Sequence, residues 1–279
     1  MTDQPKRRRR RPSAERTAEP FADTWVVLPT YNEADNLPSL APAILERLPG
    51  ATLLVVDDAS PDGTGRLADE MAAADQRVQV LHRAGKAGLG RAYVAGFRRA
   101  LERGAGRIIQ MDADWSHHPD YLPELMAALA VGPGQPRPDG ADLVIGSRYA
   151  PGGGVLNWGF MRRFVSRAGS LFARTVLHLA PRDLTGGFKA WRASTLAELP
   201  WAALHSGGYV FQIESTYLAT RRGARVAEVP IIFEDRRLGQ SKMSRRIIVE
   251  ALFVVLRLRW EQFRGHHPRA EHPAERAAG

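Results

Sequence analysis

Short apolar runs alternate with longer amphipathic segments along the first half of the chain. Each run holds about four or five residues rich in Val, Ile and Leu, a composition typical of buried strands in parallel sheets. The segments between the runs carry apolar residues at helical spacing. The pattern predicts strands at residues 25–28, 52–56, 78–81, 107–111 and 142–145, and helices at residues 36–48 (capped by Asn36), 64–74, 89–103 and 120–130.

This order of elements predicts an α/β fold with a Rossmann-like, doubly wound, mostly parallel sheet and helices on both faces. Ligands bind such sheets at the carboxyl ends of the strands. Polar motifs follow four of the predicted strands, so we expect them to line one crevice: Pro29-Thr30-Tyr31-Asn32-Glu33, Asp57-Asp58, Asp112-Ala113-Asp114 and Gly146-Ser147-Arg148-Tyr149.

Asp112 and Asp114 come directly after the fourth predicted strand. Residues two apart on an extended segment point the same way, so the two carboxylates would repel each other unless a cation lies between them. Hard oxygen ligands suit Mg²⁺ or Mn²⁺. A solvated Asp-rich turn is the alternative, but the position at the mouth of a buried strand favours a metal. Ser116 is a candidate for a further oxygen contact, whereas His117 and His118 are expected to pack in the loop.

Other polar residues are candidates for contacts with a ligand. Asp58 is expected to accept hydrogen bonds from a nucleobase or ribose, and Asp57 to be mainly structural. The glycine-rich residues 85–90 lack the Lys-Ser/Thr ending of a P-loop, and a tight turn fits them as well as a phosphate loop. Arg236 and Lys242 lie in a polar segment that fits either a loop closing on a diphosphate or a solvated basic loop.

Two segments in the second half of the chain, residues 157–179 and 244–260, combine apolar residues with arginines. Neither contains the roughly 18 consecutive apolar residues that a membrane span needs. Each fits an amphipathic helix lying in a membrane interface, with arginines reaching the headgroups. An ordinary core helix is the alternative for residues 244–260.

Composition narrows the classes of partner. The formal net charge of +9 suits an anionic partner: nucleic acid, acidic lipid or a phosphorylated ligand. The chain contains no cysteine, which excludes disulfides and thiolate metal sites. Residues 1–22 and 262–279 are poor in apolar residues and predicted to be disordered, which leaves one domain at residues 23–261. No apolar stretch follows the first arginines, so we expect no secretory signal and a cytoplasmic location.

Taken together, the motifs resemble those of family 2 glycosyltransferases, and specifically of polyprenol (dolichyl) phosphate mannosyltransferases. The resemblance covers about residues 24–260 and is carried by the segments LPTYNEADNL, VVDDASPDGT, LHRAGKAGLGRAYVAGF, MDADWSHHP, VIGSRY, DLTGGFKAWR, GGYVFQIE and VPIIFEDRRLGQSKM. It implies a GT-A fold and a divalent metal. It also implies transfer of mannose from GDP-mannose to a polyprenyl phosphate with inversion, on the inner face of a membrane.

The resemblance further implies roles for individual residues. The nucleoside is expected to contact Pro29, Tyr31, Glu33, Val56 and Asp58. The nucleotide sugar is expected to contact Asp112, Ala113 and Asp114, and the metal Asp112, Asp114 and Ser116. The phosphates or the sugar are expected to contact Arg148, Arg236 and Lys242, the last two stabilising the leaving diphosphate. Membrane attachment is expected through the two amphipathic segments or through a membrane-anchoring partner protein.

A lipid phosphate acceptor would simplify the chemistry. The second pKa of a phosphomonoester is about 6, so the acceptor is already a nucleophile at pH 7 and needs no general base. Its phosphate is expected to meet Arg162 and Arg163. Transfer of glucose to a lipid phosphate is an alternative reaction. A basic nucleic-acid-binding protein is the alternative from another class, but acidic pairs at strand ends would repel phosphate, so no specific nucleic acid is expected as a partner.

Overall fold

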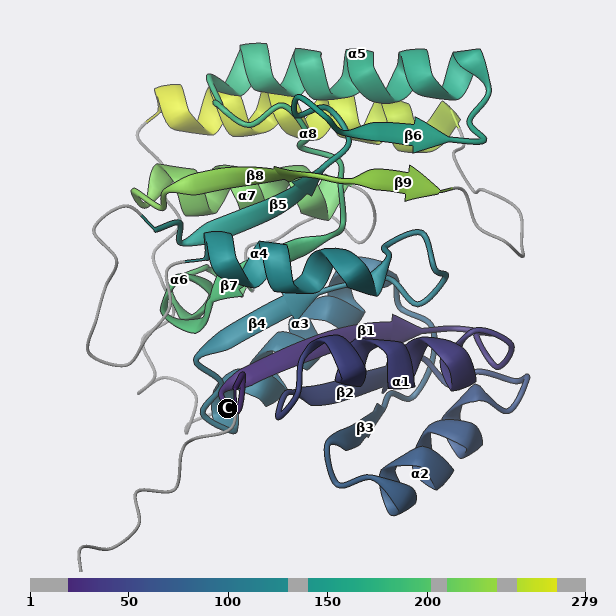
Figure 1. The fold of residues 1–279 in the computed structure, drawn as a ribbon. Helices are drawn as coiled ribbons and strands as arrows, with labels where there is room; N and C mark the ends of the chain where they lie inside the picture. The colour runs from purple at the N-terminus through teal and green to yellow at the C-terminus, as the bar shows by residue number, and fades with distance from the viewer. Residues whose placement is uncertain (1–19, 130–139, 202–209, 235–244, 265–279) are drawn as a thin grey trace, which may run out of the picture.

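The computed structural model describes residues 20–129, 140–201, 210–234 and 245–264. A seven-stranded sheet crosses the molecule in the order β3-β2-β1-β4-β7-β5-β8 (Figure 1). Its strands are β1 (Thr24–Thr30), β2 (Thr52–Asp57), β3 (Val78–His82), β4 (Arg107–Gln110), β5 (Leu143–Ser147), β7 (Lys189–Arg192) and β8 (Val226–Pro230). Only β7 is antiparallel to its neighbours, β4 and β5. The predicted mostly parallel α/β sheet is therefore confirmed.

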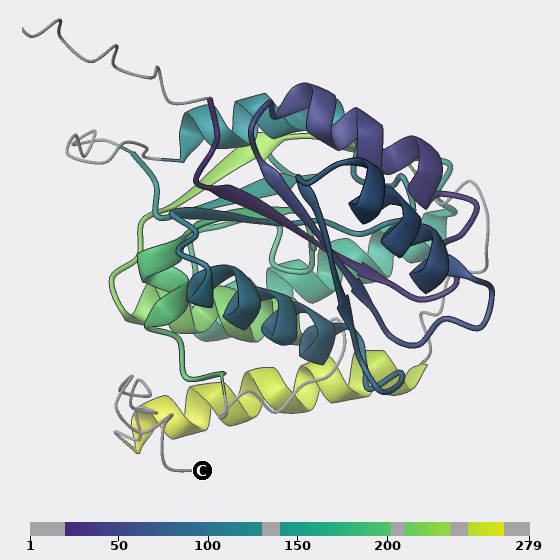
Figure 2. The same ribbon diagram turned by 90° about the horizontal axis from the view of Figure 1, so that it is seen from below.

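Helices cover both faces of the sheet because successive residues of a strand point to opposite sides. In β1, Val26 and Leu28 face a core shared with α1 (Leu37–Arg47), α2 (Thr64–Ala74) and α4 (Leu122–Ala128). Trp25 and Val27 face a core shared with α3 (Leu89–Glu102), α6 (Ala193–Ala197) and α7 (Val210–Arg221). Figure 2 shows the sheet between these two layers. The predicted strands read as continuous apolar runs because both of their faces are buried.

Two long helices form a third layer outside α7. They are α5 (Phe160–Leu177) and α8 (Arg245–Phe263), which lie side by side (Figure 1). Each buries one stripe: Ala173 and Leu177 of α5 and Val255 and Leu258 of α8 reach the core. Within the described part of the chain, no helix is both long and apolar enough to cross a membrane. A small parallel sheet of β6 (Gly154–Leu156) and β9 (Ile232–Glu234) lies beside this layer.

Several boundaries differ from the sequence prediction. Gln262 and Phe263, predicted to belong to the C-terminal tail, are part of α8. The fourth predicted helix begins as a 3-10 turn, Pro119–Tyr121, before α4. Asn36 lies at the start of α1 but makes no side-chain cap hydrogen bond; its amide nitrogen donates to Glu33 Oε2 at 2.8 Å. Residues 1–19 and 265–279, the greater part of the predicted tails, lie outside the described residues.

The sequence pattern did not predict β7, β8 or α7. Every residue of α7 from Val210 to Ala219 is buried, including Gln212, Glu214 and Thr216. A helix buried on all sides has no polar face, so the helical alternation that reveals amphipathic helices is missing.

Candidate active site

The loops that follow β1, β2, β4 and β5 all lie at the carboxyl edge of the sheet, as predicted, but of the four motifs only those after β4 and β5 line the cavity described below. β1 pairs with both β2 and β4, so the strand order reverses direction beside β1. Ligand sites of doubly wound sheets lie at such a reversal. The Met111 N–H donates to the Val27 carbonyl at 3.3 Å, which aligns the start of the Asp112 loop with the end of β1.

Asp112 is held at two points. Its Oδ1 accepts a hydrogen bond from the Tyr93 hydroxyl at 2.5 Å, and its backbone N–H donates to His117 Nδ1 at 3.1 Å. The other carboxylate oxygen, Oδ2, makes no hydrogen bond to any residue that the structure describes. Gly187 lies beside it, where a Cβ atom would come within 3.3 Å of Oδ2. The backbone therefore approaches Asp112 at a distance that a larger residue would crowd.

Asp114 is held by its own loop. The Ser116 N–H donates to Asp114 Oδ1 at 3.1 Å, and the Ser116 hydroxyl donates to the same oxygen. Trp115 between them has a φ of 63°, in the left-handed region, which costs a residue with a Cβ roughly 1–2 kcal/mol. Ala113 is buried. The loop thus keeps a strained turn that brings the Ser116 side chain back onto Asp114.

The adjacent histidines pack in the loop, as predicted. The His117 ring stacks on Phe188 with centroids 4.9 Å apart and meets Phe233 edge-on at 5.6 Å. Burial lowers the pKa of His117, although the charges of nearby carboxylates act in the opposite direction. His118 lies at the start of the 3-10 turn and accepts weakly from the Asp120 N–H at 3.4 Å. Both rings thus make packing contacts within the loop, and His117 Nδ1 also accepts the hydrogen bond from the Asp112 N–H.

The oxygens of Asp112, Asp114 and Ser116 form a donor set of the kind that hard cations prefer. Among the described residues, no three His, Cys, Asp or Glu side chains gather closely enough to hold an ion by themselves. Mg²⁺ sites often use one or two carboxylates and complete their shell with waters and substrate phosphates. The residues therefore fit a divalent ion that binds together with a phosphate ligand.

A second group of polar residues lies at the ends of β1, β2 and β3. Asp58 is buried and forms an ion pair with Arg83. Burial raises the pKa of Asp58 by more than the Arg83 charge lowers it. Lys86 Nζ lies 3.7 Å from the centroid of the Tyr31 ring, a cation–π contact. Tyr31 and Asp58, which are predicted to contact the nucleoside, thus each contact a cation. Arg83 was not identified from the sequence.

The other predicted nucleoside residues are partly or fully buried. Glu33 receives a hydrogen bond on its carboxylate from Asn36, and its backbone N–H donates to Thr64 Oγ1 at 2.9 Å. Pro29 is buried in β1. The Val56 side chain is fully buried, and a Cβ atom on Gly96 of α3 would lie 3.1 Å from it. Any contact of Val56 with a ligand would therefore come from its backbone.

Asp57 has the structural role that the sequence predicted. Its Oδ1 accepts from the hydroxyls of Thr30 at 3.2 Å and of Ser60 at 2.5 Å, and its Oδ2 accepts from the Ser60 N–H at 3.1 Å. These bonds tie the ends of β1 and β2 together and orient the loop that carries Asp58.

Arg148 is buried in an ion pair that the sequence did not predict. Its Nε and Nη2 each donate to Asp183 at 2.7 Å, and Nη2 also donates to the Thr185 hydroxyl at 2.8 Å. Burial alone would raise the pKa of Asp183, but the guanidinium and the hydrogen bonds hold it below its ordinary value. Arg148 therefore keeps its charge and a fixed orientation.

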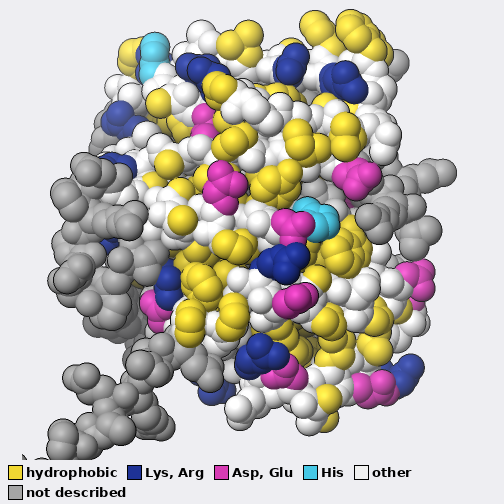
Figure 3. Space-filling view, viewed as in Figure 1, with side chains coloured by type: hydrophobic (Ala, Val, Ile, Leu, Met, Phe, Trp, Pro, Cys, Tyr) yellow, Lys and Arg dark blue, Asp and Glu magenta, His cyan; other side chains and the backbone are white. Residues whose placement is uncertain are grey.

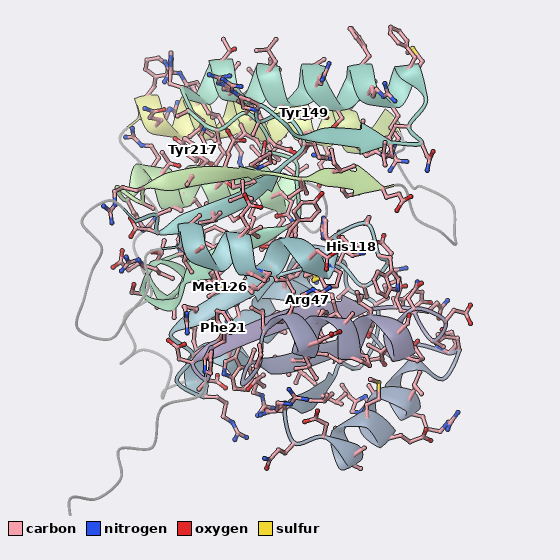
Figure 4. All side chains as sticks on the ribbon, viewed as in Figure 1. Phe21, Arg47, His118, Met126, Tyr149 and Tyr217 are labelled. Carbon is pink, nitrogen blue, oxygen red and sulfur yellow. The ribbon has the colours of Figure 1, made fainter. Side chains whose placement is uncertain are left out.

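Arg148 and two arginines of α5 contact the same two aromatic rings. Its guanidinium carbon lies 5.3 Å from the Tyr149 ring and 5.4 Å from the Trp158 ring. Arg167 lies on the Tyr149 ring at 5.5 Å, and Arg162 on the Trp158 ring at 4.1 Å. Tyr149 lies beneath α5, where its hydroxyl donates to Ser166 at 2.7 Å (Figure 4). Three cations are thus gathered around two rings; we call these five residues the arginine–aromatic stack.

A cavity of about 130 Å³ lies between the sheet edge and the outer helices. Its polar lining includes Asp112, Asp114, Ser116, His117, Arg148, Arg162 and Ser166. Its apolar lining comes largely from α5, α7 and α8: Val165, Phe172, Val210, Ile213, Leu252 and Val255. Arg163 is exposed and does not line the cavity. The remaining predicted residues, Arg236 and Lys242, lie outside the described residues.

A buried polar cluster lies near Gly187, between the sheet and α7. Lys189 Nζ donates to the Gln212 carbonyl at 2.8 Å and to Thr216 Oγ1 at 3.0 Å, and Gln110 Nε2 donates to Gln212 Oε1 at 2.7 Å. Burial lowers the pKa of Lys189 to about 7, against the attraction of Asp183. No sequence pattern indicates this cluster, because its members come from three distant elements.

Comparison with known proteins identifies relatives over most of the chain. Residues 25–199 match the profile of glycosyl transferase family 2. The chain is 48% identical over 242 residues to an undecaprenyl-phosphate mannosyltransferase of Micrococcus luteus, covering 85% of this chain and 96% of that protein. It is 47% identical over 240 residues to a polyprenol monophosphomannose synthase of Mycolicibacterium smegmatis, covering 86% and 88% respectively.

Solved structures share the architecture at lower identity. The glucosyl-3-phosphoglycerate synthase of Mycobacterium tuberculosis, in a complex with Mn²⁺ and UDP-glucose, is 21% identical with a TM-score of 0.59; the match covers 85% of this chain and 78% of that one. The same enzyme with phosphoglyceric acid is 20% identical with a TM-score of 0.59, covering 83% and 79%. The likeness to these structures concerns the fold, and it confirms the predicted GT-A architecture.

Proposed function

The chain belongs to glycosyl transferase family 2, and from that premise we propose that it transfers mannose from GDP-mannose to a polyprenyl phosphate with inversion, at the cytoplasmic face of a membrane. The names of the two relatives support the sugar and the class of acceptor. One structural observation carries the proposal: a single cavity is lined both by Asp112 and Asp114 and by apolar side chains of α5 and α8. Such a cavity suits a phosphate that carries a long hydrocarbon chain.

The donor would bind at the ends of β1, β2 and β4. At one end of this region, Tyr31 contacts Lys86 and Asp58 contacts Arg83. We assign the nucleoside to this end. Asp112 and Asp114, with Ser116 nearby, would hold Mg²⁺ or Mn²⁺ together with the diphosphate. The ion would supply positive charge against the charge that develops on the leaving GDP. We assign the same task to Arg236 and Lys242.

The acceptor phosphate would bind beside Arg162 and Ser166, which are one turn apart on α5 and both line the cavity. A phosphate oxygen attacks the anomeric carbon of mannose as the bond from that carbon to the GDP oxygen breaks. The electron pair of the broken bond leaves with GDP, and attack from the opposite side inverts the carbon. The acceptor oxygen carries no proton at pH 7, so no side chain needs to act as a base. Arg163, exposed on α5, is better placed for lipid headgroups.

The outer helices would rest on the membrane surface. Large apolar side chains are exposed along both: Phe160, Met161, Phe164 and Leu171 of α5, and Val249, Leu252, Phe253, Leu256, Trp260 and Phe263 of α8. Hydrophobic and basic side chains lie together over α5 (Figure 3). Exposed apolar patches of this extent mark interaction surfaces, and flanking arginines would add attraction to anionic lipids. A membrane-anchoring partner protein could share this surface.

A transfer assay tests the proposal. The full chain is incubated with labelled GDP-mannose and undecaprenyl phosphate in vesicles containing anionic lipid, with Mg²⁺ or with EDTA. We expect a lipid-extractable β-linked mannosyl phosphate that forms only without chelator, and much slower transfer from UDP-glucose. A faster reaction with UDP-glucose would reassign the donor. Full activity in EDTA would refute the metal, and an α-linked product would refute single displacement.

A further inference from the structure

We propose that Tyr93 is a positioning residue for the metal-binding carboxylate of Asp112. The Tyr93 hydroxyl donates to Oδ1 and so holds the carboxylate with Oδ2 available to a divalent ion. The inference rests on the proposed function, in which Asp112 binds the ion. Nothing in the motif around Asp112 identifies this partner, because Tyr93 lies on α3 and is 19 residues away.

The Tyr93 ring is fixed on two sides. It stacks on Phe97 with centroids 5.7 Å apart and on Phe211 with centroids 6.2 Å apart, and it is fully buried. Gly96 brings α3 close to the sheet, since a Cβ atom there would lie 2.3 Å from Val27 Cγ1. Tyr93 is one turn nearer the start of α3 than Gly96. The hydroxyl is therefore held at the carboxyl edge, where Asp112 follows β4.

The hydrogen bond has a defined direction. A carboxylate oxygen only accepts hydrogen bonds, so the Tyr93 hydroxyl is the donor and Asp112 Oδ1 the acceptor. The other anchor of Asp112, His117, acts on the backbone and leaves the carboxylate free to turn. Asp114, in contrast, is held by Ser116 of its own loop. Among the described residues, Tyr93 is therefore the group that orients the Asp112 carboxylate.

A purely structural role predicts a different result from a positioning role. The Tyr93 ring fills the core between Phe97 and Phe211, and Tyr93→Phe keeps that ring while removing only the hydroxyl. Tyr217→Phe is the matched control. Tyr217 lies on α7, where its hydroxyl contacts the Leu258 carbonyl at 3.5 Å, and it does not line the cavity. Thermal unfolding of both variants shows whether each keeps its fold.

The direct measurement is the binding of Mn²⁺ to the full chain in the presence of one equivalent of GDP. Water-proton relaxation monitors the binding, because it distinguishes protein-bound Mn²⁺ from free Mn²⁺–GDP. Loss of a partner that orients a metal ligand typically weakens affinity about 10–100-fold. We expect a weakening in this range for Tyr93→Phe and none for Tyr217→Phe. In turnover, the KM for Mn²⁺ rises by a similar factor while kcat at saturating Mn²⁺ stays within about threefold.

An unchanged dissociation constant for Mn²⁺ in folded Tyr93→Phe overturns the inference. If that variant does not fold, Phe211→Leu provides the test, because it loosens one side of the stack and leaves the hydroxyl in place. The inference then requires weaker Mn²⁺ binding, and unchanged binding overturns it. A wild-type chain that does not bind Mn²⁺ refutes the proposed metal site itself, an outcome distinct from equal binding by wild type and variant.

Discussion

The charged residues that line the cavity are carboxylates on the side proposed to bind the donor and arginines on the side proposed to bind the acceptor. On the donor side, the loops after β2 and β4 present the buried carboxylates of Asp58 and Asp114 and, beside them, that of Asp112. On the acceptor side, the arginine–aromatic stack gathers Arg148, Arg162 and Arg167. Both sides are proposed to bind a phosphate group. The difference teaches that carboxylates bind an anion only through a cation, whereas guanidinium groups attract the anion themselves, although at Arg148 the carboxylate of Asp183 offsets part of the charge.

The hydrogen-bond partners of the charged residues also lie at different distances along the chain. Asp114 is held by Ser116, two residues away, and Asp57 by Ser60, three residues away. Arg148 is held by Asp183, 35 residues away. The turns that carry Asp57 and Asp114 therefore take their shape from local hydrogen bonds, whereas Arg148 depends on a distant segment. Asp112 combines both kinds of contact, because its carboxylate is held by Tyr93, 19 residues away. Substitutions on the donor side should therefore lower kcat. Substitutions on the acceptor side should lower the stability of the fold or the affinity for the acceptor.

The largest expected effect is on the donor side. Asp114→Ala should lower kcat by about 10³-fold even at saturating Mg²⁺, because the ion that offsets the leaving charge loses a ligand. Transfer of labelled mannose measures this. Asp69→Ala, on the exposed surface of α2, should leave kcat within about twofold. Near-normal turnover of Asp114→Ala in saturating Mg²⁺ would show that the donor side does not act through a metal ion. The contrast between the two sides would then not hold.

On the acceptor side, Asp183→Asn should lower the free energy of unfolding by about 3 kcal/mol. The substitution leaves the buried Arg148 guanidinium without its counter-ion, and breaking a buried pair in this way typically costs about 3–5 kcal/mol. Urea denaturation measures the change. Glu70→Gln, which breaks the exposed pair of Arg66 and Glu70, should cost less than about 1 kcal/mol. Equal costs for the two variants would show that burial of the Arg148 pair has no energetic consequence.

Two neighbouring arginines of α5 sharpen the comparison within the acceptor side. Arg162→Ala should raise the KM for polyprenyl phosphate about 10–100-fold, the range expected for loss of a hydrogen bond to a charged group. Arg163→Ala, which removes an exposed arginine outside the cavity, should change it by less than about threefold. The KM for GDP-mannose should not change in either variant. A larger effect at Arg163 would move the acceptor phosphate to the surface of the helix.

The smallest expected effect concerns Lys189, on the strand between the two sides. Its pKa of about 7 is below the ordinary value of 10.5, so above pH 7 the unfolded chain binds more protons than the folded one. Stability then rises with pH. Between pH 7 and 8 the wild type should gain about 1 kcal/mol relative to Lys189→Met. Urea midpoints at the two pH values test this. Parallel pH profiles for wild type and variant would show that Lys189 does not titrate there.

The donor side could be largely predicted from the sequence. Strand, turn and carboxylate are adjacent in the chain, so the order of the residues alone places Asp58, Asp112 and Asp114 at a common edge, which the pairing of β1 with β2 and β4 confirms. Their anchors were missed for physical reasons. Tyr93 and Phe97 are four residues apart on one face of α3, a spacing that predicts core packing and says nothing about a hydroxyl partner.

The acceptor side could be predicted only in part. The two outer helices showed apolar and basic stripes, because one face of each is exposed. Asp183 and Trp158 showed no comparable signal, since the buried ion pair of Asp183 with Arg148 and the contact of Arg148 with the Trp158 ring join residues from separate segments. The four-residue β7 carries a lysine where a buried strand would normally be apolar, which obscured it.

The reversed direction of β7 has a consequence for how such an enzyme can be altered. A chain that enters an antiparallel strand does so at the edge where the parallel strands end, so the segment from Asp183 to Phe188 reaches the active edge ahead of its strand. The segment brings Asp183, which binds Arg148, and Gly187, which lies beside Asp112, to the same edge as the ends of β1, β2 and β4. A change in its length would therefore disturb both charged groups at once while β1, β2 and β4 keep their register.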